Sequence, residues 1–242
     1  MGDLVITVVM ITVDRSPSPN YLGATLDNFD RGGVWRSSQV SEIHLLNSNE
    51  DTKWLRAYRA QLDGRVIIHA SVGRGLLPCE NAGVALIAGA KSGSEWVLFC
   101  EDDIDVCDHF VDSVSRWLDR FVDPRYRVYS FGCAYPEAEG AAPAWEYQVK
   151  DFYGTQCFAI RPKDAVSLGE YLLTNPPVRG GAHPGKYDLM MHDWMKNTHP
   201  DLHCFLASAP SFVQHLGEQS VIEPREKVHQ FKSWRGQQWR YL

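Results

Sequence analysis

One stretch decides the fold of this chain: Val97-Leu98-Phe99-Cys100-Glu101-Asp102-Asp103-Ile104. Four apolar residues end abruptly in three carboxylates, and an apolar run of this kind predicts a buried strand. Because an unpaired charge is costly to bury, we expect the acids at the exposed end of that strand, facing a cation. Hard oxygen ligands favour Mg²⁺ or Mn²⁺, which proteins often bind together with substrate phosphates. The stretch therefore predicts a metal site for a nucleotide diphosphate.

The same acids have a second interpretation. Asp102, Asp103 and Asp105 could instead complement the dipole of a helix that begins just after them. Three consecutive acids at the end of an apolar strand are unusual for a helix start, so we favour the metal site.

Strand and helix patterns alternate along the rest of the chain. Apolar and β-branched runs predict strands at 4–13, 42–46, 66–69, 126–131, 152–161, 203–207 and 211–214. Helical patterns occupy 21–29, 51–62, 79–90, 110–121, 164–173 and 188–197. This alternation predicts an α/β fold with a mostly parallel central sheet. Ligands of such sheets bind beyond the carboxyl ends of the strands, where the loop after residue 13 and the acids at 101–103 both lie.

Length and composition predict one main domain. The 242 residues suit one large α/β domain or two small ones; we place a single domain at 1–223, followed by a basic and aromatic tail at 224–242. The net charge of −6 gives no general attraction to nucleic acid. Six scattered cysteines without a CxxC pair predict free thiols in a reducing compartment. The first apolar stretch is too short for a membrane span and has no signal-peptide features, so we expect a cytoplasmic protein.

Three further motifs could carry chemistry, each with a plainer alternative. His215 follows a short apolar strand and could bind a metal beside a carboxylate, or it could be an ordinary histidine. Asp188 follows the Pro- and Gly-rich loop 175–186 and could act as a general base, or cap the helix. The segment Thr12-Val13-Asp14-Arg15 could hold the base and ribose of a nucleotide, or be an ordinary polar loop.

In combination and in this order, the motifs resemble a metal-dependent glycosyltransferase of the GT-A fold, and in particular the N-acetylglucosaminyltransferase IV family. The resemblance spans roughly residues 4–220, and Gly83 stands where that family has an acid. The matching segments are Thr12-Val13-Asp14-Arg15, Tyr21-Leu22, Thr25-Leu26, Glu80-Asn81-Ala82-Gly83, Cys100-Glu101-Asp102-Asp103-Ile104, Tyr187-Asp188-Leu189-Met190 and Pro210-Ser211-Phe212-Val213-Gln214-His215-Leu216-Gly217.

The resemblance implies a single GT-A (Rossmann-like) nucleotide-sugar-binding domain and a role for each motif. Asp103 and His215 would bind Mn²⁺ or Mg²⁺, and Asp188 would be the catalytic base of an inverting transfer, with Asp193 as the fallback. A UDP-sugar is the expected donor. The donor-binding residues would be Thr12, Val13, Arg15, Asn81, Glu101 and Asp102. The family's membrane anchor and stem are not seen, so a bacterial or phage enzyme is the natural expectation.

The acceptor is left open between a glycan and a modified nucleic acid. The tail combines Arg225, Lys227, Lys232, Arg235 and Arg240 with Phe231, Trp234, Trp239 and Tyr241. Such a segment could hold phosphates and stack on bases, which would suit a phage-type DNA glycosyltransferase acting on a hydroxylated base. Alternatively, its aromatic side chains pack on the domain and its charges face solvent.

Two other functional classes fit less well. A nucleotidyltransferase should have a Gly-rich, basic loop after its first strand, but residues 14–20 contain no glycine and only one basic residue, Arg15. A catalytically silent sugar-binding module would not need the intact carboxylates and His215.

Overall fold

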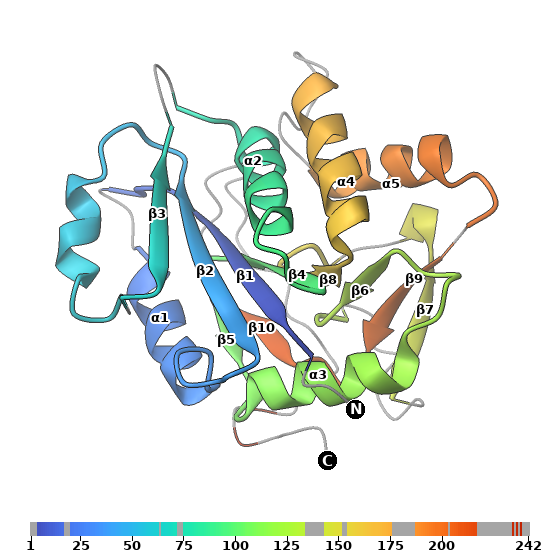
Figure 1. Cartoon of the computed structure of the whole chain (residues 1–242), viewed down its shortest axis with the longest axis horizontal. Coiled ribbons are helices and arrows are strands. Elements are labelled where there is room, and N and C mark those ends of the chain that lie inside the picture. The colour runs from blue at the N-terminus through green and yellow to red at the C-terminus, as the bar shows by residue number, and fades with distance from the viewer. Residues whose placement is uncertain are drawn as a thin grey trace.

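The apolar run that opens the acidic stretch is a central strand of an eight-stranded sheet (Figure 1). The computed structural model describes residues 4–16, 20–62, 64–71, 75–133, 143–151, 154–175, 187–202 and 204–216, together with 234, 236 and 238. The strand order is β3-β2-β1-β4-β8-β6-β9-β7. The strands are β1 (Ile6–Thr12), β2 (Val40–Asn47), β3 (Val66–Ala70), β4 (Trp96–Glu101), β6 (Val128–Ser130), β7 (Ala144–Gln148), β8 (Cys157–Ile160) and β9 (Cys204–Ser208).

The sheet is mostly parallel, as the sequence predicts. Strands β3, β2, β1 and β4 run parallel to one another, and β6 runs parallel to β9. Strand β8 is antiparallel to both β4 and β6, and β7 is antiparallel to β9. The parallel register pairs Ile11 of β1 with Glu101 of β4. The loop after β1 and the acids after β4 therefore lie side by side at one edge of the sheet.

Helices cover both faces of the sheet (Figure 1). Alternation along β1 shows why, since Val8 and Met10 pack on one face and Val9 packs on the other. The first face is covered by α1 (Leu22–Arg31) and α3 (Phe110–Phe121). The second is covered by α2 (Pro78–Ala90), α4 (Pro162–Thr174) and α5 (Tyr187–Thr198). Both layers are needed because the central strands are buried on both sides.

Gly83 has a packing role in α2. A Cβ atom at this position would lie 2.9 Å from the carbonyl oxygen of Gly169 in α4, which is too close. The two helices cross at these glycines, so an acidic side chain could not be accommodated at position 83 without moving α4. This close crossing explains why a glycine stands at position 83.

Some predicted elements are wrong in extent or were missed. The helix predicted at 51–62 is only a short 3₁₀ helix, η1 (Lys53–Tyr58). Two further segments were not predicted as strands: the edge strand β7, and β5 (Ile104–Val106), which pairs with β10 (Val213–His215) in a separate two-stranded sheet. A second short 3₁₀ helix, η3 (Val149–Asp151), follows β7. These segments are short or half-exposed, so their apolar patterns are weak.

Two segments singled out by the sequence, the loop 175–186 and the tail 224–242, lie mostly outside the described residues. The loop 175–186 is described only at residue 175, and the tail only at 234, 236 and 238. Trp234 is partly buried against the core on the α1 and α3 side, which fits packing for this tail aromatic. The predicted division into 1–223 and 224–242 stays a prediction.

Two predictions about chemistry and membranes can be compared with the described part of the chain. The described structure contains five buried cysteines that form no disulfide bond: Cys79, Cys100, Cys107, Cys133 and Cys157. Within the described residues, none of the helices has the length and apolar character of a transmembrane span.

Candidate active site

The acids at 102 and 103 form the connection between β4 and β5. Thr25, a fully buried residue of α1, holds the backbone of this connection through hydrogen bonds. The Thr25 hydroxyl accepts the N–H of Ile104 at 3.1 Å and lies 2.9 Å from the carbonyl oxygen of Asp102. A helix on one face of the sheet thereby sets the backbone shape of the acidic turn.

The acids are buried, so the expectation of an exposed strand end is wrong. Asp102 is 2% exposed and Asp103 is 7% exposed. Asp102 is compensated by Arg15, which donates one hydrogen bond to each carboxylate oxygen at 2.7 Å, and by the Thr12 hydroxyl at 2.5 Å. Burial raises the pKa of Asp102, although the bonds from Arg15 and Thr12 oppose this. Paired charges can be buried where isolated ones cannot.

The helix-dipole interpretation does not fit. Strand β5 follows the acids, and α3 begins only at Phe110. Asp105 instead pairs with Arg31 at 2.5 Å.

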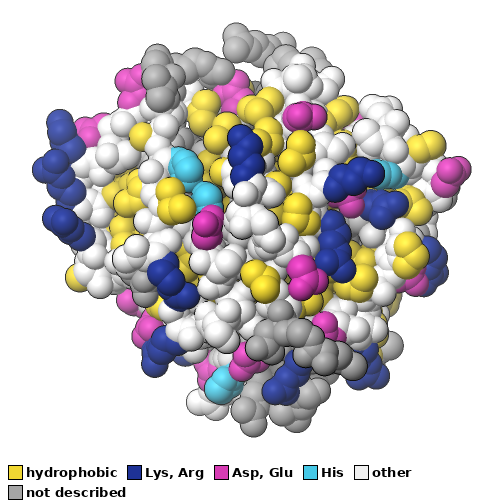
Figure 2. Space-filling view, in the orientation of Figure 1, with side chains coloured by type: hydrophobic (Ala, Val, Ile, Leu, Met, Phe, Trp, Pro, Cys, Tyr) yellow, Lys and Arg dark blue, Asp and Glu magenta, His cyan; other side chains and the backbone are white. Residues whose placement is uncertain are grey.

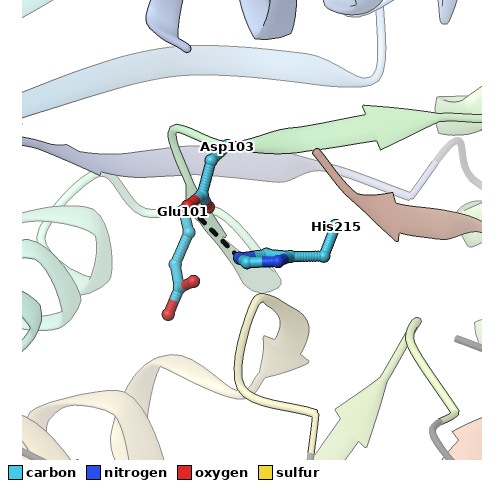
Figure 3. Close-up of side chains that lie close together, drawn as sticks. All are labelled: Glu101, Asp103 and His215. Carbon is cyan, nitrogen blue, oxygen red and sulfur yellow. Dashed lines mark ion pairs between the residues drawn. The ribbon is translucent and has the colours of Figure 1, made fainter. Parts of the chain in front are cut away.

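Three side chains from distant parts of the chain converge at this turn (Figure 3). Glu101, Asp103 and His215 each offer a ligand atom, and these atoms lie within 4.8 Å of one another. The antiparallel pairing of β10 with β5 places His215 opposite Ile104. The His215 Nε2 atom is 3.2 Å from Asp103 Oδ2, and the N–H of Leu216 donates to the carbonyl of Asp103 at 2.7 Å. The structure therefore brings together the two predicted metal ligands and adds Glu101, which the sequence assigned to the donor.

The electrostatics of the cluster favour a cation. Burial and the nearby charge of Asp103 raise the pKa of Glu101 to about 8. Burial alone would lower the pKa of His215, but the hydrogen bond and the charge of Asp103 raise it above its usual value. Burial opposes ionisation of Asp103, yet His215 and Arg15 bring its pKa below the usual value. Three carboxylates thus share one guanidinium and one imidazole, which leaves excess negative charge when all are ionised.

Two buried atoms suggest that the cluster is built for a metal ion. Asp103 Oδ1 and His215 Nδ1 have no hydrogen-bond partner among the described residues. Buried polar atoms without a partner are rare, and a bound cation can satisfy such an acceptor. Carboxylate oxygens with one imidazole suit Mn²⁺ and, with the oxygens alone, Mg²⁺. Glu101, Asp103 and His215 are the residues that would hold the ion.

Helix α5 begins beside this cluster. The hydroxyl of Tyr187 donates a hydrogen bond to Glu101, so the first turn of α5 is tied to the end of β4. The next residue, Asp188, is half-buried in that turn. Asp188 Oδ1 accepts the N–H of Leu189 at 2.9 Å, and since α5 already begins at Tyr187, Asp188 is not its N-cap residue. Asp193 is exposed. The contact of Tyr187 was missed, although its position just before Asp188 in a matched motif was a signal.

The other predicted donor residues separate into two groups. Thr12 and Arg15 lie at the cluster through Asp102, and Val13 lies half-buried between them in the chain. Asn81 is elsewhere engaged, because its amide donates to the carbonyl of Leu46 at 3.0 Å and to the hydroxyl of Ser48 at 2.8 Å. Asn81 therefore fastens the carboxyl end of β2 to α2.

Replacing Arg15 tests the stabilising role of its pair with Asp102. The change Arg15→Met should lower the free energy of unfolding by about 3–5 kcal/mol, because it leaves a buried carboxylate unpaired. Urea titration would measure this, and adding Asp102→Asn should recover much of the loss.

The matched control is Arg125→Met. Arg125 pairs with Asp123 at 3.0 Å, but the Arg125 side chain is 67% exposed. Loss of this exposed pair should cost less than about 1 kcal/mol. Equal effects of the two substitutions would refute the stabilising role of the buried pair.

Comparison with known proteins identifies the fold. No protein-family model matches the sequence, and no curated protein matches it. Among solved structures, a crystal structure of S. aureus TarS 1–349 is similar with a TM-score of 0.54 and 13% identity, covering 87% of this chain and 60% of that one. This chain therefore spans less than two thirds of the TarS fragment.

Two other structures are similar at lower scores. The mannosyltransferase PcManGT from Pyrobaculum calidifontis, in complex with GDP-Man and Mn²⁺, has a TM-score of 0.47 and 15% identity, covering 85% of this chain and 54% of that one. A putative nucleotide-diphospho-sugar transferase from Desulfovibrio desulfuricans G20 has a TM-score of 0.46 and 14% identity, covering 79% of this chain and 75% of that one. The similarity to the TarS fragment, together with the mostly parallel central sheet, shows that the chain has the predicted α/β fold of GT-A type.

Proposed function

We propose that this chain is a metal-dependent glycosyltransferase that moves a sugar from a nucleotide-sugar donor, with a UDP-sugar expected, to an acceptor hydroxyl. One observation carries the proposal. Glu101, Asp103 and His215 converge at the carboxyl end of a central strand in a sheet of GT-A type. In α/β sheets, this edge is where nucleotides bind.

The residues around the cluster divide the work of transfer. Glu101, Asp103 and His215 would hold a divalent cation, which supplies positive charge to the diphosphate leaving group. Thr12, Val13 and Arg15 would contact the donor, and Thr12 and Arg15 both bond to the buried Asp102 beside the cluster. Tyr187, through its bond to Glu101, holds the start of α5 against the cluster.

Asp188 is the proposed catalytic base. Its carboxylate takes the proton of the acceptor hydroxyl as the hydroxyl oxygen bonds to the anomeric carbon, and the bond from that carbon to the diphosphate oxygen breaks. Inversion of the anomeric centre is what the family resemblance supports.

A thermal-shift screen tests donor binding directly. The screen would use UDP- and GDP-sugars with and without Mn²⁺. At a hundredfold excess over Kd, a ligand that binds only the folded state adds about 2.7 kcal/mol of stability. For a chain of this size that corresponds to a rise in Tm of roughly 5–10 °C.

We expect a rise for at least one nucleotide sugar, and only with Mn²⁺ present. Release of the nucleoside diphosphate from the same donor would establish turnover. A screen in which no nucleotide sugar changes Tm or releases its diphosphate would refute the proposed function.

A further inference from the structure

One face of the sheet carries a pair of histidines away from the acidic cluster. Helix α2 packs on β1, β2 and β4, whereas β3 is the edge strand of the sheet. The side chains of β3 on the α2 side are consequently open to solvent, and Ile67 is 43% exposed there. Figure 2 shows histidine side chains lying together at the surface over β2 and β3. His44 of β2 and His69 of β3 stand on the same face of the sheet in the parallel register.

The two imidazoles meet through their ring nitrogens. His44 Nδ1 lies 3.0 Å from His69 Nε2, and the rings are nearly parallel, at 9°. On its other side, His44 Nε2 lies 3.0 Å from Glu42 Oε2. A carboxylate acceptor there places the proton of His44 on Nε2 and leaves the Nδ1 lone pair facing His69. The side chain of His44 is only 8% exposed, so this orientation is held by packing.

His69 is the more accessible of the two imidazoles. His44 is buried, whereas the half-buried position of His69 on the edge strand leaves its outer side open to solvent.

We propose that His44 and His69 form a second metal site, which takes a borderline divalent cation such as Zn²⁺. At Zn–N distances of about 2.0–2.1 Å and a tetrahedral angle, two nitrogen ligands lie about 3.4 Å apart. The observed 3.0 Å contact is a hydrogen bond between the two ring nitrogens, so the ion would replace the shared proton, and the more exposed His69 ring would turn until both nitrogens face the ion. Glu42 behind His44 completes a carboxylate–histidine–metal arrangement, which orients the ligand and raises its basicity. Water molecules fill the remaining positions on the exposed side.

The two sites should prefer different metals. The acidic cluster offers two carboxylates and one imidazole, whereas the histidine pair offers two nitrogens and no oxygen. Nitrogen ligands select Zn²⁺, Cu²⁺ and Ni²⁺ over Mn²⁺ and Mg²⁺. Because the histidine pair stands on β2 and β3, its ion would also join the edge strand to its neighbour.

Calorimetric titration of the full chain with ZnCl₂ tests the proposal. The unmodified chain and the Asp103→Asn variant should both show a zinc-binding event at the histidine pair. In the His69→Asn variant, the zinc affinity of this event should be at least tenfold weaker. Glu42→Gln should weaken the same event by about tenfold, in the range seen when a partner behind a metal ligand is lost. Mn²⁺-dependent donor binding should be unchanged in His69→Asn. The matched control is His109→Asn, which replaces an exposed histidine whose left-handed backbone conformation asparagine tolerates.

A second measurement covers variants that fold poorly. The melting temperature of each variant in EDTA shows whether the variant is folded. Separately, an electron paramagnetic resonance spectrum of the unmodified chain loaded with Cu²⁺ reports the ligands of the ion. That spectrum should show coupling to two imidazole nitrogens, reduced in His69→Asn. Zinc affinity that is equal in the unmodified chain, His44→Asn and His69→Asn would overturn the proposal, as would a single zinc event that Asp103→Asn removes.

Discussion

Asp103→Asn should abolish sugar transfer and Mn²⁺-dependent donor binding together. Asp103 lies at the centre of the cluster, within 3.2 Å of His215 and 3.6 Å of Arg15. An amide in its place removes the charge that would hold the cation. Without that ion the leaving diphosphate loses its charge stabilisation, and we expect transfer to fall by about 10³-fold or more. Radiolabelled sugar transfer and the Mn²⁺-dependent thermal shift would measure the two losses.

The control for Asp103 is Asp105→Asn. Asp105 is also buried and lies two residues further along, but it pairs with Arg31 and takes no part in the metal cluster. This variant should bind donor in the presence of Mn²⁺ and retain transfer, even if it is less stable. Normal transfer by Asp103→Asn would show that the cluster is not the metal site of the reaction.

Asp188→Asn should separate chemistry from donor binding. The amide cannot accept the proton of the acceptor hydroxyl, so we expect kcat to fall by about 10²–10⁴-fold. The ligands of the proposed cation are untouched, and donor binding with Mn²⁺ should persist at its normal strength. Asp103→Asn and Asp188→Asn would therefore differ in the thermal shift although both lose transfer.

Asp193→Asn is the control for Asp188. Both aspartates are on α5, but Asp193 is exposed whereas Asp188 adjoins the Tyr187 contact to Glu101. Transfer should be close to normal in Asp193→Asn. A large loss in this variant and none in Asp188→Asn would make Asp193 the base instead.

Local sequence patterns were sufficient to predict the central strands of the sheet and most of its helices. Strands β1 and β4 are continuous apolar runs because both faces of a central parallel strand are covered by helices. The position of Asp103 after such a run predicted its place at the carboxyl edge of the sheet. Apolar patterns did not predict β7, because this edge strand is half-exposed. They also predicted a longer helix at 51–62, where the structure has only the short 3₁₀ helix η1.

Contacts between distant residues could not be predicted from local patterns. Burial of Asp102 depends on Arg15, which lies 87 residues earlier in the chain, so a view of the acidic stretch alone suggested exposure. The place of Glu101 in the cluster depends on which face of β4 its side chain occupies and on where β10 brings His215. These are consequences of the tertiary fold, and only the family motifs linked the segments in advance.

The residues of the cluster come from two sheets of very different size, the eight-stranded sheet and the small sheet of β5 and β10. Glu101 ends a strand of the large sheet, whereas His215 belongs to a three-residue strand that, within the described part of the chain, pairs with β5 alone. In the proposed site, one ion would link the large sheet to the small sheet. Occupancy of the site would then add directly to the free energy needed for local unfolding of β10, while detachment of β10 would release the ion without melting the rest of the domain.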